Sequence, residues 1–272
     1  MRDDLLRFRP EFPILERSTY LVSNSLGAMP RATRDRLAEY ADVWATRGVR
    51  AWAEAWWELP VRVGDVVAPL IGAAPNEVAM VANVSIAHAA VLSALDFSGE
   101  RDTIVMTALD FPSVRYAIEG MAARVGARVV VVPAEPDGLS VDEARIMAAI
   151  DERTRLVAIS HVLFRSAFVV DAAPIVRHAH AMGALVMLDA YHSVGVMPVD
   201  VQALGCDFLA GGVLKWLCGG PGGCFLYAAP DVEARARGAV RPGLTGWQAH
   251  VRPFAFDDAM EHAEGAWRWL TG

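Results

Sequence analysis

Lys215 is the only lysine among 25 basic residues, so the chain uses arginine wherever a permanent positive charge is enough. An amine differs from a guanidinium because it can lose its proton and attack a carbonyl carbon. Lys215 lies between apolar Leu214 and Trp216 and precedes a glycine-rich turn, a desolvated setting that lowers the pKa of an amine. The position predicts a nucleophilic lysine. The alternative is a surface lysine at a hairpin edge, retained by chance.

Asp189 ends an apolar run 26 residues before Lys215 (215 minus 189). A carboxylate in an apolar setting is costly unless it faces a cation or a hydrogen-bond donor, and a protonated pyridine nitrogen would be such a partner. Enzymes that use pyridoxal phosphate (PLP) pair a carboxylate on the ring nitrogen with a lysine that holds the cofactor as a Schiff base. The two residues therefore predict a PLP site. The alternative is that Asp189 caps a helix after the strand.

Two further segments could complete such a site. Residues 83–88 begin a predicted helix, so the amide groups at its start and the Ser85 hydroxyl would form a phosphate cradle. An ordinary serine helix cap is the alternative for Ser85. Phe111 follows a predicted strand closely, and its ring could stack on the cofactor.

Three other side chains could belong to the same site. His192 lies three residues after Asp189, on the same exit from the strand. Asp110 is interpreted as a solvent-exposed turn residue as readily as a site residue. Trp247 is interpreted as part of the core, because the chain has eight tryptophans.

The elements that must position these residues alternate between short apolar runs and amphipathic stretches from residue 76 onward. This alternation predicts a largely parallel α/β sheet covered on both faces. Ligands bind beyond the carboxyl ends of such strands, where Ser160, Asp189 and the Lys215 loop would converge. The predicted strands are residues 103–106, 128–132, 156–159, 185–188, 206–210 and 224–228, and the predicted helices are 114–125, 140–150 capped by Ser140, and 172–182.

Composition excludes several classes of protein. The chain has 272 residues and a net charge of -7, and its basic residues are scattered, which argues against a nucleic-acid partner. Its N-terminus carries acidic residues and lacks the apolar core of a signal peptide, so a cytoplasmic location is expected. The longest uncharged stretch, residues 78–95, is interrupted by polar side chains and predicts a buried segment with no membrane partner. Three cysteines without a C-x-x-C pair predict neither disulfides nor a metal site.

Several motifs occur in the order seen in kynureninases, and the sequence resembles that family over nearly its whole length. Kynureninases belong to the class V aminotransferase group of fold-type-I PLP enzymes. The resemblance implies the three-layer, mostly parallel central sheet of their large domain. The motifs are YLVSNSLG at 20–27, FPS at 111–113, LDAYHSVG at 188–195, GGPGG at 219–223 after Lys215, and Gly246-Trp247 with His250.

The resemblance also assigns residues to the cofactor. It implies that Val84 and Ser85 hold the phosphate and that Phe111 stacks on the ring. It implies further contacts with the cofactor from Ser160 and His192.

The remaining assignments concern the chemistry and the assembly. The resemblance implies that Asp189 contacts the pyridine nitrogen and that Lys215 is the Schiff-base lysine and main proton carrier. It implies that Trp247 reaches the phosphate of the neighbouring subunit, and hence a homodimer with shared active sites.

The resemblance divides the chain into three parts. Residues 1–45 would form an N-terminal arm and helix, residues 46–252 the PLP-binding large domain, and residues 253–272 the start of a small domain that is absent or truncated. Two departures from the family pattern lie in the large domain. Val114 stands where the family has an aspartate after Phe-Pro-Ser, and Leu214 stands where it has a tyrosine before the lysine.

The function that the resemblance implies is a hydrolase of tryptophan catabolism. Such an enzyme would cleave the Cβ–Cγ bond of a small amino-acid substrate, L-kynurenine or a relative, to an anthranilate-type product and alanine. One alternative is another class V PLP enzyme, such as an aminotransferase, a desulfurase-like lyase or an epimerase. Desulfuration generally needs a mobile cysteine in a later loop, and no cysteine follows Cys224. Another alternative is a non-catalytic protein that retains the PLP fold.

Overall fold

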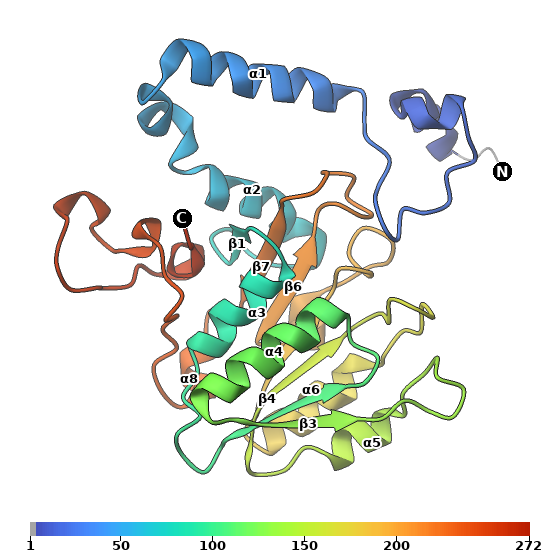
Figure 1. Cartoon of the computed structure of the whole chain (residues 1–272), viewed down its shortest axis with the longest axis vertical. Coiled ribbons are helices and arrows are strands. Elements are labelled where there is room, and N and C mark those ends of the chain that lie inside the picture. Colours follow the sequence, from blue (N-terminus) through green and yellow to red (C-terminus); the bar gives the residue numbers. More distant parts are fainter. Residues whose placement is uncertain (1–3) are drawn as a thin grey trace.

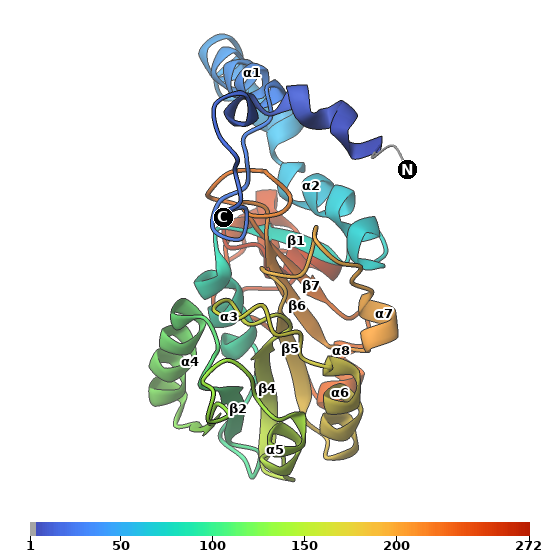
Figure 2. The ribbon, with the colours of Figure 1, turned by 90° about the vertical axis from the view of Figure 1, so that its right-hand side faces the viewer.

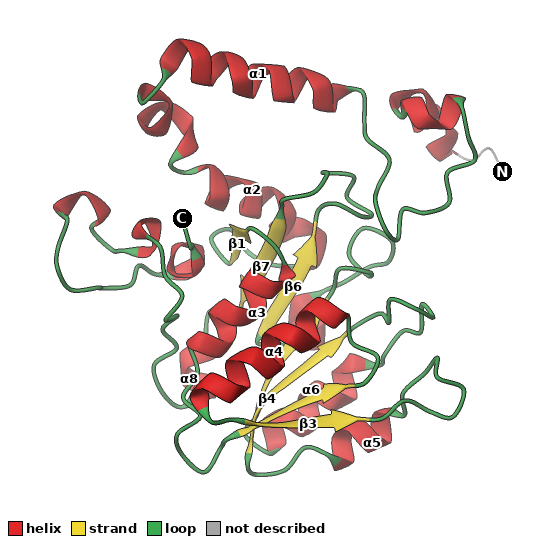
Figure 3. Cartoon of the chain, in the orientation of Figure 1, coloured by secondary structure: helices red, strands yellow, loops and turns green. Residues whose placement is uncertain are grey.

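The computed structural model describes residues 4–272, which form one seven-stranded sheet with helices on both faces and an extended N-terminal part (Figure 1). Figure 3 shows how the strands gather in the lower half of the molecule while the N-terminal helices lie above them. The longer elements are α1 (Ala32–Arg47), α2 (Leu59–Val67), β1 (Val78–Val81), α3 (Val84–Ser93), β2 (Thr103–Thr107), α4 (Pro112–Val125), β3 (Arg128–Val132), α5 (Glu143–Ala148), β4 (Thr154–Ser160), α6 (Ala172–Ala181), β5 (Leu185–Asp189), α7 (Val201–Leu204), β6 (Phe208–Gly212), β7 (Cys224–Ala228) and α8 (Val232–Ala236).

Short 3-10 or π-helical turns connect or flank these elements. They are η1 (Asp4–Glu11), η2 (Pro13–Glu16), η3 (Trp52–Trp56), η4 (Ala68–Ile71), η5 (Trp247–Ala249), η6 (Pro253–Ala255) and η7 (Gly265–Trp269).

The strand order in the sheet is β1-β7-β6-β5-β4-β2-β3. β3, β2, β4, β5 and β6 run parallel, and β7 is antiparallel to both β6 and β1. All residues of β2, β5, β6 and β7 are buried, which explains their continuous apolar runs without alternation. The predicted mostly parallel sheet is confirmed.

Helices cover both faces of the sheet and make the three predicted layers. Figure 2 shows α3 and α4 on one face and α6, α7 and α8 on the other. The ends of these helices are set by local chemistry, since Asn83 caps α3 through its side chain and Gly126, in the left-handed region, ends α4. α1 lies apart from the sheet, and none of its residues is buried.

The register of the central strands places the ends of β4, β5 and β6 side by side. Ser160 pairs with Asp189, and Asp189 pairs with Ala210. The loops that follow these three strands therefore leave the sheet at one edge, and the loop after β6 carries Lys215.

Most predicted elements are present, with boundaries that differ by a few residues. The helix predicted at 140–150 is shorter, and its cap is Asp142, which accepts a hydrogen bond from the amide of Ala144 at 2.8 Å. The prediction of Ser140 as the cap is wrong, because Ser140 bonds Asp137 in the preceding turn. The predicted buried stretch 78–95 contains an edge strand, β1, followed by α3. Within residues 4–272, no helix is both long and apolar enough to span a bilayer.

Candidate active site

A cavity of about 480 Å³ lies at the carboxyl ends of the parallel strands. Its volume falls in the range of about 300–1,000 Å³ that is usual for small-molecule sites. Its walls come from the loops after β2, β4, β5 and β6, the first turn of α3, and the segment between η2 and α1, which is called the N-terminal arm below. The lining residues are Asn24, Ser25, Asn83, Val84, Phe111, Phe164, Asp189, Tyr191, His192, Leu214 and Lys215.

Lys215 is buried in the wall of this cavity, with 9% of its surface exposed. Burial lowers the pKa of its amine, and the carboxylate of Asp189 acts in the opposite direction. Its Nζ lies 5.6 Å from the centre of the Phe111 ring and 5.8 Å from that of Tyr191. The alternative of a surface lysine at a hairpin edge is excluded.

His192 is the hydrogen-bond partner of Lys215, through its Nε2 and the Nζ of the lysine. Burial lowers the pKa of His192 to about 4, and the neighbouring ammonium group adds to this effect. The imidazole is therefore neutral at neutral pH.

Asp189 ends β5 and faces the same cavity. Its Oδ1 accepts a hydrogen bond from the amide of Tyr191 at 2.9 Å. Burial raises its pKa to about 6, against the effect of this hydrogen bond. Within residues 4–272 it has no salt bridge. The helix-cap alternative is excluded, because turns follow Asp189 and the next helix begins at Val201.

The first turn of α3 forms another wall of the cavity. The Asn83 side chain accepts from the amide of Ile86 at 3.0 Å, and Val84 begins the helix. The start of a helix presents unpaired amide groups and a partial positive charge, which favour an anion. Ser85, the second residue of α3, does not line the cavity, and its interpretation as the helix cap is wrong because Asn83 holds that place.

Phe111 is the residue that precedes α4, and its ring packs edge-on against Phe164 at 5.3 Å between centres. Ser160 lies beneath the cavity without lining it. Its amide donates to Asp110, which is buried, so the interpretation of Asp110 as a solvent-exposed residue is wrong.

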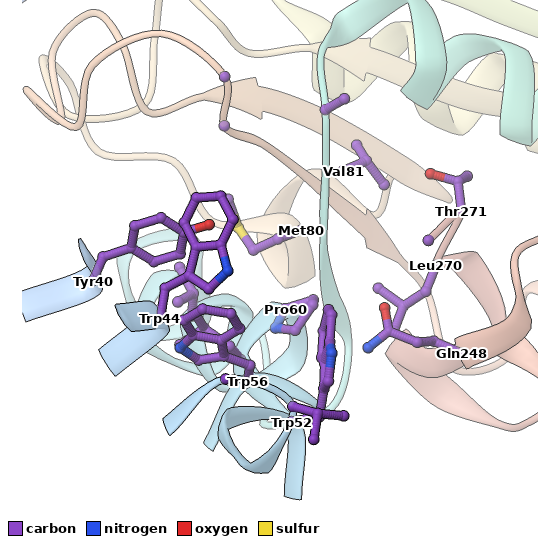
Figure 4. A pocket seen from close by; sticks show the side chains of 18 residues that line it. Tyr40, Trp44, Trp52, Trp56, Pro60, Met80, Val81, Gln248, Leu270 and Thr271 are labelled. Carbon is purple, nitrogen blue, oxygen red and sulfur yellow. The ribbon is translucent and has the colours of Figure 1, made fainter. Parts of the chain in front are cut away.

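A second cavity, of about 810 Å³, lies between the N-terminal helices, β1 and the C-terminal residues. Figure 4 shows Tyr40, Trp44, Trp52 and Trp56 grouped on one side, with Leu270 and Thr271 on the other. Its described lining holds no histidine, cysteine, acidic or basic side chain. It therefore offers apolar contact and no acid–base chemistry.

The family model of aminotransferase class-V matches residues 19–251. The chain belongs to this family. Kynureninases of Burkholderia mallei (strain SAVP1) and Pseudomonas fluorescens are each 34% identical to it over its whole length. The chain spans about 65% of the length of these two relatives.

Solved structures show the same fold as this class-V chain. A mutant of C-DES, with glycine covalently linked to the PLP cofactor, has a TM-score of 0.84 and 24% identity, covering 97% of this chain and 69% of its own. The cysteine desulfurase CsdA of Escherichia coli has a TM-score of 0.80 and 21% identity, covering 99% and 67%. These likenesses confirm the predicted fold class.

Five of the eight predicted site residues line the cavity of this class-V chain: Val84, Phe111, Asp189, His192 and Lys215. Ser85 is next to Val84 in the sequence, and Ser160 pairs with Asp189 in the sheet, but neither lines the cavity. Trp247 does not line it either. Trp247 begins η5, is 47% exposed, and packs against Trp57 and Phe254 at 4.8 and 5.4 Å between ring centres. It is therefore not a core residue.

Sequence reasoning missed four residues of the cavity wall. Asn24 and Ser25 belong to the motif at 20–27 that resembles the kynureninases, and that motif could have identified them as site residues. Tyr191 lies between two predicted site residues, and Phe164 follows β4 by four residues. Nothing in the local sequence of Phe164 signals its position.

Proposed function

We propose that this chain is a PLP-dependent enzyme in which Lys215 carries the cofactor. The observation that supports this best is that the amine of Lys215 and the carboxylate of Asp189, which has no cationic ion-pair partner among the described residues, line one cavity. A buried carboxylate without a cation is costly, and a protonated ring nitrogen would supply one.

The groups around the cavity fit the parts of PLP. Lys215 offers an amine for the aldehyde, and Asp189 a carboxylate for the ring nitrogen. Phe111 offers an aromatic face for the ring, and the start of α3 at Val84 offers amide groups for the phosphate. We propose Ser85, Ser160 and His192 as further contacts, as the family resemblance implies.

When bound, PLP supplies an electron sink for a carbanion at the α-carbon of an amino acid. The chain's own groups control the protons. Because burial lowers the pKa of Lys215, its Nζ is more readily deprotonated and available as a base. Neutral His192 is the hydrogen-bond partner of Nζ through Nε2 and holds the amine in place.

We propose hydrolytic cleavage of an L-kynurenine-type amino acid as the reaction. The support is the 34% identity with proteins named kynureninase. Two residues depart from the kynureninase pattern. Leu214 lines the cavity where kynureninases have a tyrosine, and Val114 is fully buried on α4 where they have an aspartate. Without that tyrosine, proton transfer would depend on Lys215.

Another class V reaction on a small amino acid is the second candidate. The residue that favours it is Leu214, because its aliphatic side chain in the cavity wall removes a hydroxyl that could assist protonation. Among such reactions, desulfuration has no cysteine in the described cavity lining to support it, since Cys206 and Cys224 are buried and Cys218 lies outside that lining.

We also propose a homodimer with shared active sites and a cytoplasmic location. The position of Trp247 supports the shared site, because Trp247 lies outside the cavity of its own chain and is half exposed, so a second chain could contact it. In a dimer it would contribute to the phosphate site of the neighbouring subunit.

Reductive labelling tests the cofactor proposal. After incubation with PLP and reduction with borohydride, mass spectrometry of the digested protein should find the cofactor on Lys215. Because Lys215 is the only lysine, the N-terminal amine is the one competing amine. Lys215→Arg keeps the charge and should lose the label and the visible absorbance of the bound cofactor. An unlabelled Lys215 in the wild-type protein would contradict the proposal and favour a non-catalytic role.

Product analysis separates the two candidate reactions. The PLP-loaded protein is incubated with L-kynurenine, and anthranilate and alanine are measured by chromatography. Anthranilate that disappears in Lys215→Arg supports kynurenine cleavage. Labelled Lys215 without anthranilate, together with sulfide from cysteine or a keto acid from another amino acid, supports the second candidate.

A further inference from the structure

Asp110 is a buried acidic residue directly before Phe111, with 4% of its surface exposed. It lies in the turn that joins β2 to α4. Burial raises the pKa of its carboxyl, and several hydrogen bonds act against this effect. An acidic residue in such a setting is retained only where its hydrogen bonds are well satisfied.

Both oxygens of Asp110 accept hydrogen bonds from the ends of two strands. Oδ1 accepts from the amide of Ser160 at 2.7 Å, and Oδ2 accepts from the amide and hydroxyl of Thr107 at 2.7 and 3.0 Å. Every donor points at the carboxylate, so the ionised form matches its surroundings. Asp110 thereby fastens the turn that carries Phe111 to the carboxyl ends of β2 and β4.

Asp110 also forms a pair of buried carboxylates with Asp189. Ser160, which donates to Asp110, pairs with Asp189 across β4 and β5. The charge of Asp110 opposes ionisation of Asp189. The other titratable groups nearby come from the same strands and the loops that follow them. They are Lys215, His192, Tyr191, Cys224 and His161, whose backbone amide donates to the carbonyl of Asp189.

We propose that Asp110 is a positioning residue of the cofactor site, which fixes the Phe111 turn against β4 and adds a second negative charge beneath the cavity. This inference rests on the proposed PLP function. It predicts two effects of losing the carboxylate. The turn that carries Phe111 would be held less firmly, and the positive charge formed by Lys215 and its cofactor would be stabilised less.

A purely structural role would produce neither effect, and Asp207 supplies the matched control. Its side chain is fully buried, accepts from the amide of Val186 at 2.6 Å and pairs with His180 and Arg235 at 2.9 and 3.2 Å. It precedes β6 and so lies at the amino-terminal end of that strand, whereas the cavity lies at the carboxyl ends.

The test compares Asp110→Asn, Asp207→Asn and wild type as full-length, PLP-loaded proteins. Three quantities are measured: the Kd for PLP, the pH midpoint of the visible absorbance of the bound cofactor, and the Tm. We expect Asp110→Asn to raise the Kd roughly fivefold, as for one lost hydrogen bond. We expect it to lower the pH midpoint by roughly one unit, because a nearby negative charge is lost. Asp207→Asn should lower the Tm and leave the other two unchanged.

Each other result has a defined meaning. Unchanged Kd and midpoint in Asp110→Asn, or equal changes in both variants, would overturn the inference while leaving the PLP proposal intact. A wild-type protein that takes up no PLP on Lys215 would overturn both. Should Asp110→Asn fail to fold, Thr107→Val decides, since it keeps both carboxylates and removes the hydroxyl that donates to Asp110 and accepts from the amide of Leu109. A Kd about twofold higher supports the positioning role, and a wild-type Kd rejects it.

Discussion

Asp189 is buried in surroundings that disfavour the ionised form of its carboxyl group. Its pKa rises from 3.8 to about 6 because it is buried, and one amide hydrogen bond only partly compensates. Such a shift makes the ionised state less favourable by roughly 3 kcal/mol in the folded chain. This is the pattern expected of a group that serves a ligand at the expense of stability.

We therefore predict that Asp189→Asn stabilises the cofactor-free chain at pH 8. A carboxyl whose folded pKa is raised favours folding when protonated, so wild-type stability falls as pH rises between about 4 and 6. The amide carries no charge and avoids this loss, a gain of up to roughly 3 kcal/mol at pH 8 that shrinks towards pH 4. Urea denaturation of both proteins at each pH measures the difference.

Asp207→Asn serves as the control, because it loses the charge that pairs with Arg235 and one of its two acceptor oxygens, and should be destabilised. The same Asp189→Asn protein should retain PLP less well than wild type. A variant less stable than wild type at pH 8 would show that the Asp189 carboxylate stabilises the folded chain and would contradict the prediction.

At this scale the sequence was informative where one residue was conspicuous by itself. Lys215 stood out through the arginine bias, and Asp189 through its place at the end of an apolar run, and both line the cavity. Asp110 did not stand out, because its burial depends on Ser160, 50 residues later, and on two strands becoming neighbours. Contacts of that kind have no local signature.

The N-terminal arm is the element that closes one wall of the cavity. The amide of Gly27 donates to the carbonyl of Leu214 at 2.7 Å, which joins the arm to the lysine loop. A Cβ on Gly27 would lie 2.0 Å from the backbone oxygen of Lys215. Only glycine allows this approach, which places Asn24 and Ser25 at the cavity.

We predict that Gly27→Ala displaces the arm from the lysine loop. Overpacking of this kind costs about 1–3 kcal/mol of stability, and the amine of Lys215 should become more accessible. Because Lys215 is the only lysine, its rate of modification by an amine-reactive reagent, measured on its own peptide to separate it from the N-terminal amine, reports on this wall. Gly99→Ala is the control, since nothing lies within 4 Å of its added Cβ. Equal modification rates in the two variants would mean that the arm does not cover Lys215.

Elements were predictable where their own residues determine them. The continuous apolar runs of β2, β3 and β5 predict strands at nearly the observed positions. The antiparallel direction of β7 and the edge strand β1 were not predicted, because strand direction depends on pairing between residues such as Val78 and Tyr227, which are distant in sequence. The cap of α5 was misplaced because Ser140 and Asp142 are both good caps, and the turn with Asp137 uses the serine.

On its N-terminal side the molecule exposes several large apolar side chains. α1 buries no residue, and Tyr40, Trp44 and Trp52 are at least half exposed around the aromatic cavity of Figure 4. Apolar surface of this extent marks an interaction site or favours aggregation. It agrees with the proposed homodimer, because a second chain could cover what this chain leaves open.

We predict that the chain self-associates through this aromatic surface. Trp44 is 64% exposed, so Trp44→Glu places a charge where a partner would have to bury it and should weaken association by at least roughly tenfold, while the fold is retained. Tyr116→Glu on α4 is the control, because Tyr116 is 69% exposed and lies outside the aromatic cavity. Sedimentation over a range of concentrations measures both variants. Wild-type protein that stays monomeric, or equal weakening by both substitutions, would show that the contact lies elsewhere.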